Sequence, residues 1–121
     1  MEKKLFSVVI KVENLEMTRS FYRDILKLGE PVMDSNFWVE FRLPGDFSLF
    51  LEKKEEGEKV PESTGRTSWM YKVGNVNEVI SRLKEYGYET FSVPGEEQRV
   101  GFKTYVFCDP EGNPFHLCSG E

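Results

Sequence analysis

Few side chains in this sequence could do acid–base or metal chemistry. His116 is the only histidine, and the two cysteines are Cys108 and Cys118, which we expect to be buried free thiols. The sequence contains no Gly-rich phosphate loop, no His-Glu-x-x-His and no Gly-x-Ser-x-Gly. A Ser-His-Asp triad could form only through His116, and no spacing favours one. We therefore interpret His116 either as a general base or as a hydrogen-bonded histidine of a sheet.

The composition indicates one acidic globular domain over residues 1–121. There are 16 Lys and Arg against 21 Asp and Glu, a net charge of −5, and 39% of residues are hydrophobic. Nucleic-acid phosphates and anionic membrane surfaces would both repel such a chain, so we expect neither partner. No run of about 18 apolar residues is present, and the apolar run near the start is too short for a signal peptide, so we expect neither a membrane span nor a signal peptide. With too few cysteines for a disulfide framework, a cytoplasmic location is expected.

One pattern occurs twice, about half the chain apart. The residues Ser-x-x-x-Lys-Val-x-Asn, followed by an apolar residue, occupy 7–14 and again 68–75. This indicates an internal duplication. Each copy reads as a strand, and Asn14 and Asn75 then supply the N-cap oxygen of a helix.

A helix and further strands follow in each copy. Apolar residues recur at helical spacing until Gly29 in the first copy and Gly87 in the second. The residues at 109–113, Asp-Pro-Glu-Gly-Asn, predict a type I turn followed by a left-handed residue. Alternation predicts strands over 5–12, 37–43, 48–52, 67–73, 102–108 and 115–118, with Phe37, Val39, Phe41 and Leu43 on one face. The polar stretch 53–65 is expected to link module one, about 5–52, to module two, about 66–118.

The sequence resembles the glyoxalase / bleomycin-resistance / extradiol-dioxygenase superfamily, whose fold is called vicinal oxygen chelate. Phe-Tyr-Arg-Asp-Ile-Leu at 21–26 is similar to a motif of that family's first helix, and Asp-Pro-x-Gly-Asn at 109–113 is similar to its last turn. The resemblance covers roughly 5–118. It implies an α+β fold in which two βαβββ modules form a cupped, open mixed β-barrel with the helices outside. It also implies a ligand in the cup and a homodimer.

The same resemblance implies where a metal would bind. Metal-dependent members carry one ligand on the first strand and one on the last strand of each module, and these positions map to Ser7, Glu52, Ser68 and His116. Serine stands at both first-strand positions, where the family usually has histidine. A neutral hydroxyl is a poor ligand, and catalytic zinc needs about three stronger ones. We therefore expect no metal and no other cofactor; a divalent ion, if one binds, would use Glu52 and His116.

Strand alternation predicts which side chains face the cup. The lining is mixed, with aromatic rings, charges of both signs and one imidazole, and it suits a flat organic molecule. Each residue also has a structural alternative: Trp38 as a core cap, or Glu40 and Arg42 as a surface ion pair. The predicted ligand-binding residues are Ser7, Lys11, Trp38, Glu40, Arg42, Phe50, Glu52, Ser68, Met70, Phe102, Thr104 and His116.

Three functional hypotheses follow. The first is a metal-free small-molecule binding protein, similar to bleomycin-resistance proteins, that sequesters an aromatic or cationic antibiotic or metabolite. The acidic charge and the carboxylates of Glu40 and Glu52 favour a ligand with a cationic part. The alternative is a metal-dependent lyase, isomerase or dioxygenase with an atypical site at Glu52 and His116. The third is a metal-free enzyme that uses one of these two residues as its acid or base.

Overall fold

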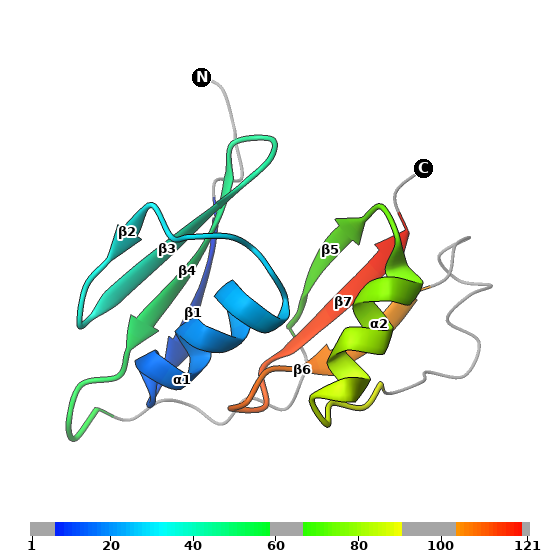
Figure 1. Cartoon of the computed structure of the whole chain (residues 1–121). Helices are drawn as coiled ribbons and strands as arrows, with labels where there is room; N and C mark the ends of the chain where they lie inside the picture. The colour runs from blue at the N-terminus through cyan, green and yellow to red at the C-terminus, as the bar shows by residue number, and fades with distance from the viewer. Residues whose placement is uncertain (1–6, 59–66, 91–103, 120–121) are drawn as a thin grey trace. The chain divides into compact units, whose positions relative to one another are not determined.

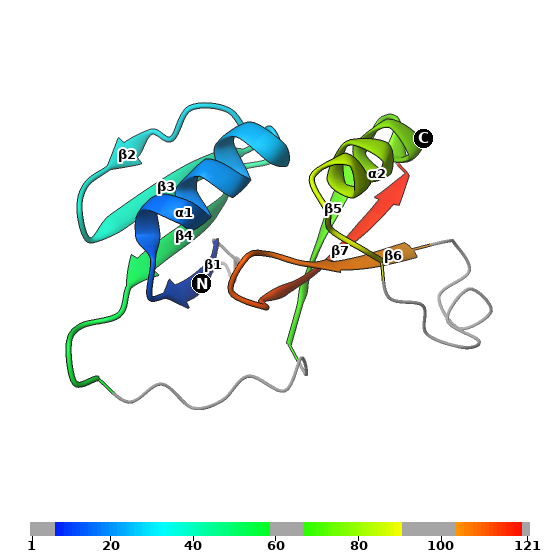
Figure 2. The ribbon, with the colours of Figure 1, turned by 60° about the horizontal axis from the view of Figure 1, so that its bottom comes forward.

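The structure, a computed structural model, describes residues 7–58, 67–90 and 104–119. The chain divides into two compact units, residues 1–62 and 63–121, and each is described by itself. Each unit has one helical segment packed on a small sheet, so the predicted α+β class is confirmed (Figures 1 and 2). Whether the two sheets enclose one ligand stays a prediction. None of the helices in the described ranges is long and apolar enough to cross a membrane.

The first unit contains a four-stranded sheet in the order β1-β4-β3-β2. Strand β1 runs parallel to β4, and the other neighbours are antiparallel. The elements are β1 Ser7–Val12, α1 Leu15–Ser20, η1 Phe21–Ile25, β2 Met33–Asp34, β3 Trp38–Leu43 and β4 Phe47–Lys53. The helix packs against one face of the sheet and leaves the opposite face for other contacts (Figure 2).

The helix of this unit begins at the predicted cap and then changes type. Asn14 Oδ1 accepts a hydrogen bond from Met17 N at 2.9 Å. From Phe21 the chain forms a π-helical turn, in which Leu26 N donates to Phe21 O at 2.9 Å. The wider turn buries Phe21 and Tyr22 together, with their rings edge to face at 5.1 Å. The sequence predicted a helix here but not this π-helical turn.

Alternation along the strands places the core as predicted, except at Phe37. Val39, Phe41 and Leu51 are fully buried beneath the helix. Phe37 is instead 70% exposed and lies before β3, in a shallow depression. The reason is local. Ser35 Oγ accepts hydrogen bonds from the backbone N–H of Phe37 and of Trp38, which forms a turn just before the strand. Strand β3 therefore begins at Trp38, and Phe37 does not follow its alternation.

The second unit repeats the arrangement with a three-stranded sheet in the order β5-β7-β6. Strand β5 runs parallel to β7, and β6 is antiparallel to β7. Asn75 Oδ1 caps the helix by accepting from Glu78 N at 3.1 Å. The elements are β5 Trp69–Val73, α2 Val76–Glu85, β6 Thr104–Cys108 and β7 Pro114–Ser119. Phe102, which we predicted as a ligand-binding residue, lies outside the described residues.

Asp109 holds the turn between β6 and β7. Its Oδ1 accepts from the backbone N–H of Glu111 and of Asn113, both at 2.9 Å, and its side chain is almost fully buried. Gly112 has a φ of +85°, the left-handed conformation that favours glycine. These contacts confirm that the Asp-Pro-x-Gly-Asn motif shapes the turn.

Candidate ligand-binding site

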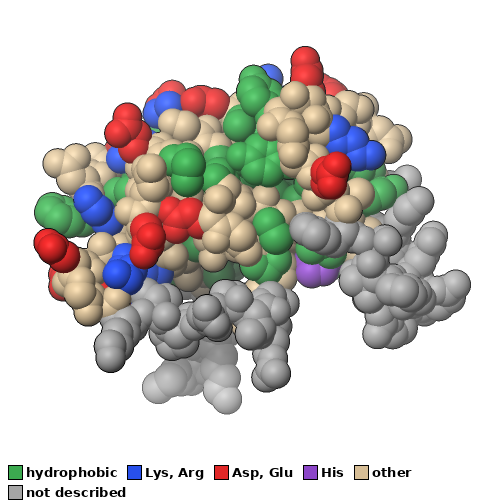
Figure 3. All heavy atoms as spheres, turned by 90° about the horizontal axis from the view of Figure 1, so that it is seen from below, with side chains coloured by type: hydrophobic (Ala, Val, Ile, Leu, Met, Phe, Trp, Pro, Cys, Tyr) green, Lys and Arg blue, Asp and Glu red, His purple; other side chains and the backbone are tan. Residues whose placement is uncertain are grey.

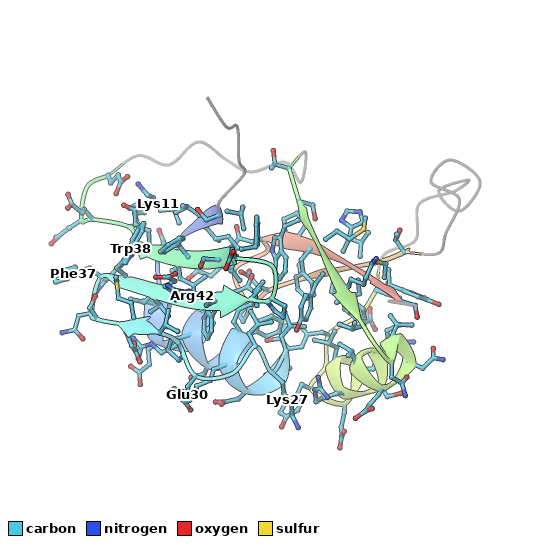
Figure 4. All side chains as sticks on the ribbon, turned by 90° about the horizontal axis from the view of Figure 1, so that it is seen from above. Lys11, Lys27, Glu30, Phe37, Trp38 and Arg42 are labelled. Atoms are coloured by element: carbon cyan, nitrogen blue, oxygen red, sulfur yellow. The ribbon has the colours of Figure 1, made fainter. Side chains whose placement is uncertain are left out.

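The predicted site residues of the first unit share the sheet face that the helix leaves uncovered. In Figure 4, Lys11, Trp38 and Arg42 lie along the strands, whereas Lys27 and Glu30 lie by the end of the helix. The strand register places the side chains of this face in three rows across β1, β4 and β3. The rows are Ser7, Ser48 and Arg42; Val9, Phe50 and Glu40; and Lys11, Glu52 and Trp38.

Two aromatic rings form the apolar part of this face. The ring centroids of Trp38 and Phe50 lie 5.0 Å apart, with the ring planes tilted by 34°. Phe50 is buried and Trp38 is half-buried, so the indole offers part of its surface to a partner. Val9, which is 48% exposed, adds an aliphatic edge next to Phe50. Such a surface suits contact with a flat ring.

Both carboxylates on this face already have basic partners. Glu40 accepts from Ser48 Oγ at 2.7 Å and from Arg42 Nη2 at 3.3 Å. Lys11 Nζ lies 3.7 Å from Glu52 Oε1 and also pairs with Glu58. The hydrogen bond between Lys11 and Glu58 raises the pKa of Lys11 and lowers the pKa of Glu58.

Two residues of these networks were absent from our predicted site. Ser48 has the same strand parity as Phe50 and Glu52, so alternation alone could have found it. Glu58 lies in the segment that we expected to be a linker. Its contact with Lys11 joins residues far apart in the sequence, and no local pattern signals such a contact.

In the second unit, His116 lies at the centre of the sheet face away from α2. Its register neighbours are Met70 on β5 and Val106 on β6, and Figure 3 shows the histidine side chain at the surface. Ser68 Oγ and His116 Nδ1 are 2.8 Å apart. Lys72 and Thr104 flank Cys118 in the next row. The structure thus brings together four of the predicted site residues of module two, namely Ser68, Met70, Thr104 and His116.

The register shows that the expected metal positions are not equivalent in the two units. Val9 pairs with Phe50, as Met70 pairs with His116, so Phe50 is the counterpart of His116. Glu52 lies one row further along and corresponds to Cys118. The mapping of Glu52 onto the last-strand ligand position therefore does not match the strand register.

The donor set of the described residues does not fit a metal of the family type. Glu52 pairs with Lys11, four residues beyond Ser7, which separates Ser7 and Glu52 by about 13 Å along the strands. One ion with bonds of about 2 Å cannot contact both. Across residues 7–58, 67–90 and 104–119, no three His, Cys, Asp or Glu side chains gather as they would around an ion.

Solved structures share this fold over nearly their whole length. A lactoylglutathione lyase from Agrobacterium tumefaciens is 19% identical and has a TM-score of 0.72, and the match covers 98% of this chain and 95% of that chain. TnmS3, an antibiotic binding protein from Streptomyces sp. CB03234, is 19% identical with a TM-score of 0.71, covering 99% and 98%. A glyoxalase family protein from Enterococcus faecalis is 28% identical with a TM-score of 0.70, covering 96% and 97%.

Sequence comparison gives the same family. No curated protein matches the chain significantly. The model of the glyoxalase-like domain family matches residues 7–118. Since that match spans almost the whole chain, this protein belongs to the glyoxalase-like domain family, within the glyoxalase / bleomycin-resistance (vicinal oxygen chelate) superfamily.

Proposed function

We propose that this protein is a metal-free binding protein that sequesters a small aromatic molecule. The observation that carries the proposal is the Trp38–Phe50 pair, which lies on the sheet face that α1 leaves uncovered. Stacking on the accessible part of a half-buried indole contributes affinity through area and ring geometry and needs no metal. The donor set supports the metal-free part, because Ser7 and Phe50 stand where a metal-dependent member would need stronger ligands.

The charges on this face refine the expected ligand. Glu40 and Glu52 are paired with Arg42 and Lys11, so a cationic ligand would have to displace a basic partner that is already in place. The geometry therefore supports the aromatic part of the sequence-based hypothesis more than the cationic part. A neutral or weakly polar flat ring that stacks on Trp38 would not need to displace Arg42 or Lys11 from its carboxylate.

The similar structures include one that favours a binding protein and one that favours an enzyme. TnmS3 is an antibiotic binding protein, and its likeness favours sequestration. The lactoylglutathione lyase favours the alternative, a metal-dependent lyase with an atypical site. Elemental analysis of protein purified without chelator separates the two. A stoichiometric transition metal would favour the lyase, whereas its absence, with no activity after nickel, zinc or iron is added, would favour the binding protein.

Tryptophan fluorescence tests the proposal, because the chain has only Trp38 and Trp69. A panel of flat aromatic antibiotics and metabolites is titrated into the wild type, Trp38→Phe and Trp69→Phe. Trp69 is buried on the helix-facing side of its sheet and serves as the matched control. We expect saturable quenching that survives in Trp69→Phe and is lost in Trp38→Phe. Absence of saturable quenching across the panel would contradict the proposal.

A further inference from the structure

Arg42 has more hydrogen-bond donors than its partner uses. In the part of the chain that the structure describes, its guanidinium makes one hydrogen bond, from Nη2 to Glu40 Oε2 at 3.3 Å. A guanidinium carries several N–H donors and no acceptor, and the Arg42 side chain is 60% exposed. Donors of this side chain are therefore open to a ligand on the uncovered face of the first unit.

The carboxylates of this face, in contrast, already have donors. Glu40 Oε2 also accepts from Ser48 Oγ at 2.7 Å, and Glu52 pairs with Lys11. A ligand whose polar group accepts a hydrogen bond meets the spare donors of Arg42 without disturbing either carboxylate. A ligand whose polar group only donates would have to compete with a partner that is already in place.

The guanidinium lies near the aromatic part of the face. Glu40 pairs directly with Phe50 across β3 and β4, so the group that binds its carboxylate lies beside the Phe50 side chain. The ring of Trp38 is 5.0 Å from that of Phe50, and Figure 4 shows Trp38 and Arg42 along the same strand. Trp38 and Glu40 are two residues apart, about 7 Å along β3. A flat bicyclic ligand that stacks on Trp38 can therefore place a polar group at Arg42.

The charge balance favours a neutral acceptor over an anion. The carboxylates of Glu40, Glu52 and Glu58 outnumber the basic groups of Lys11 and Arg42 in these networks. An anionic ligand would add a further negative charge close to Glu40, whose side chain is 8% exposed and is therefore poorly screened by water. A carbonyl oxygen accepts from a guanidinium without that repulsion.

We propose that Trp38, Phe50 and Arg42 bind a neutral aromatic carbonyl compound, that is, a flat ring system that carries a ketone, quinone or amide oxygen. This inference rests on the proposed function and names its ligand class. The ring stacks on Trp38 beside Phe50, and the carbonyl oxygen accepts from guanidinium N–H groups that Glu40 leaves unused. No covalent bond forms or breaks, so the ligand is released unchanged.

Probes that share one ring system test this assignment. 2-Acetylnaphthalene carries a neutral acceptor, 2-ethylnaphthalene has no acceptor, and 2-naphthoate carries an anionic one. Equilibrium dialysis against the full chain gives the dissociation constant of each probe. One hydrogen bond to an exposed guanidinium predicts about five- to tenfold tighter binding of 2-acetylnaphthalene than of 2-ethylnaphthalene. 2-Naphthoate should bind more weakly than 2-acetylnaphthalene.

Substitution of the guanidinium assigns the effect to Arg42. In Arg42→Met, which removes every donor, the affinity ratio of 2-acetylnaphthalene to 2-ethylnaphthalene should fall to about one. Arg42→Lys keeps a cationic donor and should retain part of the ratio. Arg23→Met is the matched control and should leave the ratio unchanged, because Arg23 pairs with Asp24 on η1, away from this face. A ratio of two probes on one variant cancels any loss of folded protein.

The infrared carbonyl band of carbon-13-labelled 2-acetylnaphthalene gives a second readout. A hydrogen bond from a guanidinium lowers its frequency, and we expect this shift in the wild type and Arg23→Met but not in Arg42→Met. Equal binding of 2-acetylnaphthalene and 2-ethylnaphthalene, or tighter binding of 2-naphthoate, would overturn the ligand class while aromatic binding stands. Failure of 2-acetylnaphthalene to bind, while the wider panel quenches Trp38, would overturn it as well. If no probe binds and the panel does not quench Trp38, the proposed function also fails.

Discussion

Replacing Ser48 by alanine removes a hydroxyl that donates at 2.7 Å to the carboxylate of Glu40. The Glu40 side chain is only 8% exposed, so water cannot readily replace the lost donor. A hydrogen bond to a charged group contributes about 1.5–3 kcal/mol, and we expect Ser48→Ala to lower the free energy of unfolding by about that amount. The other partner, Arg42, has a side chain that is 60% exposed, so Arg42→Gln should cost at most about 1 kcal/mol.

Urea unfolding at neutral pH measures both changes as shifts of the transition midpoint at constant slope. Ser81→Ala, an exposed position in α2, is the matched control for removal of a hydroxyl and should be close to neutral. The expected order is a larger loss for Ser48→Ala than for Arg42→Gln. If Arg42→Gln cost as much as Ser48→Ala or more, burial would not decide which partner holds the Glu40 carboxylate, and the reasoning would fail.

Three further predictions concern stability. Lys11→Met should lower the urea midpoint at pH 7. The difference from wild type should shrink as the pH falls from about 4.3, the unfolded value for Glu, through the lowered pKa of Glu58, and as the pH rises from about 10.4, the unfolded value for Lys, through the raised pKa of Lys11. A pH-independent difference would contradict the ion pair. Asn75→Ala should cost about 1 kcal/mol through loss of the cap, whereas Asn77→Ala, inside the same helix, should cost less, as circular dichroism melts would show. Thr104 Oγ1 is buried and has no hydrogen-bond partner in the described part of the chain. Thr104→Val should therefore leave the free energy of unfolding unchanged or raise it by about 1 kcal/mol. A decrease of more than about 1 kcal/mol, measured by urea unfolding, would show that the hydroxyl has a partner.

Local chemistry made much of the fold predictable. Asn14 and Asn75 cap their helices because the first backbone N–H groups of a helix lack a partner within the helix. A side-chain oxygen just before the helix accepts from one of them, and the sequence supplies such a residue in each copy. Asp109 forms its turn for a similar reason. Alternation also predicted the faces of β3 and β4, because strand geometry alone sets which side chains share a face.

The parts that could not be predicted depend on contacts between distant residues or on small shifts of register. The π-helical turn at Phe21 accompanies the burial of two rings, of which Tyr22 lies beside Phe41 on β3, and such contacts join residues distant in the sequence. The Ser68–His116 contact joins two strands separated by a helix and a further strand. Glu52 and Phe50 differ by one row, and only strand pairing identifies Phe50 as the counterpart of His116. When the pairing of two strands shifts by two residues, each side chain stays on the same face of the sheet but meets a different residue on the next strand. Alternation along one strand therefore cannot detect such a shift.

The central claim is that an aromatic ligand binds beside Trp38 without a metal. Calorimetry with the strongest quencher from the panel tests it most directly, with protein dialysed against chelator and with the same protein after nickel, zinc or iron is added back. The account predicts equal affinity in all samples and loss of binding in Trp38→Ala, which removes the stacking ring. Binding that disappears with the chelator and returns with a stoichiometric metal would contradict it.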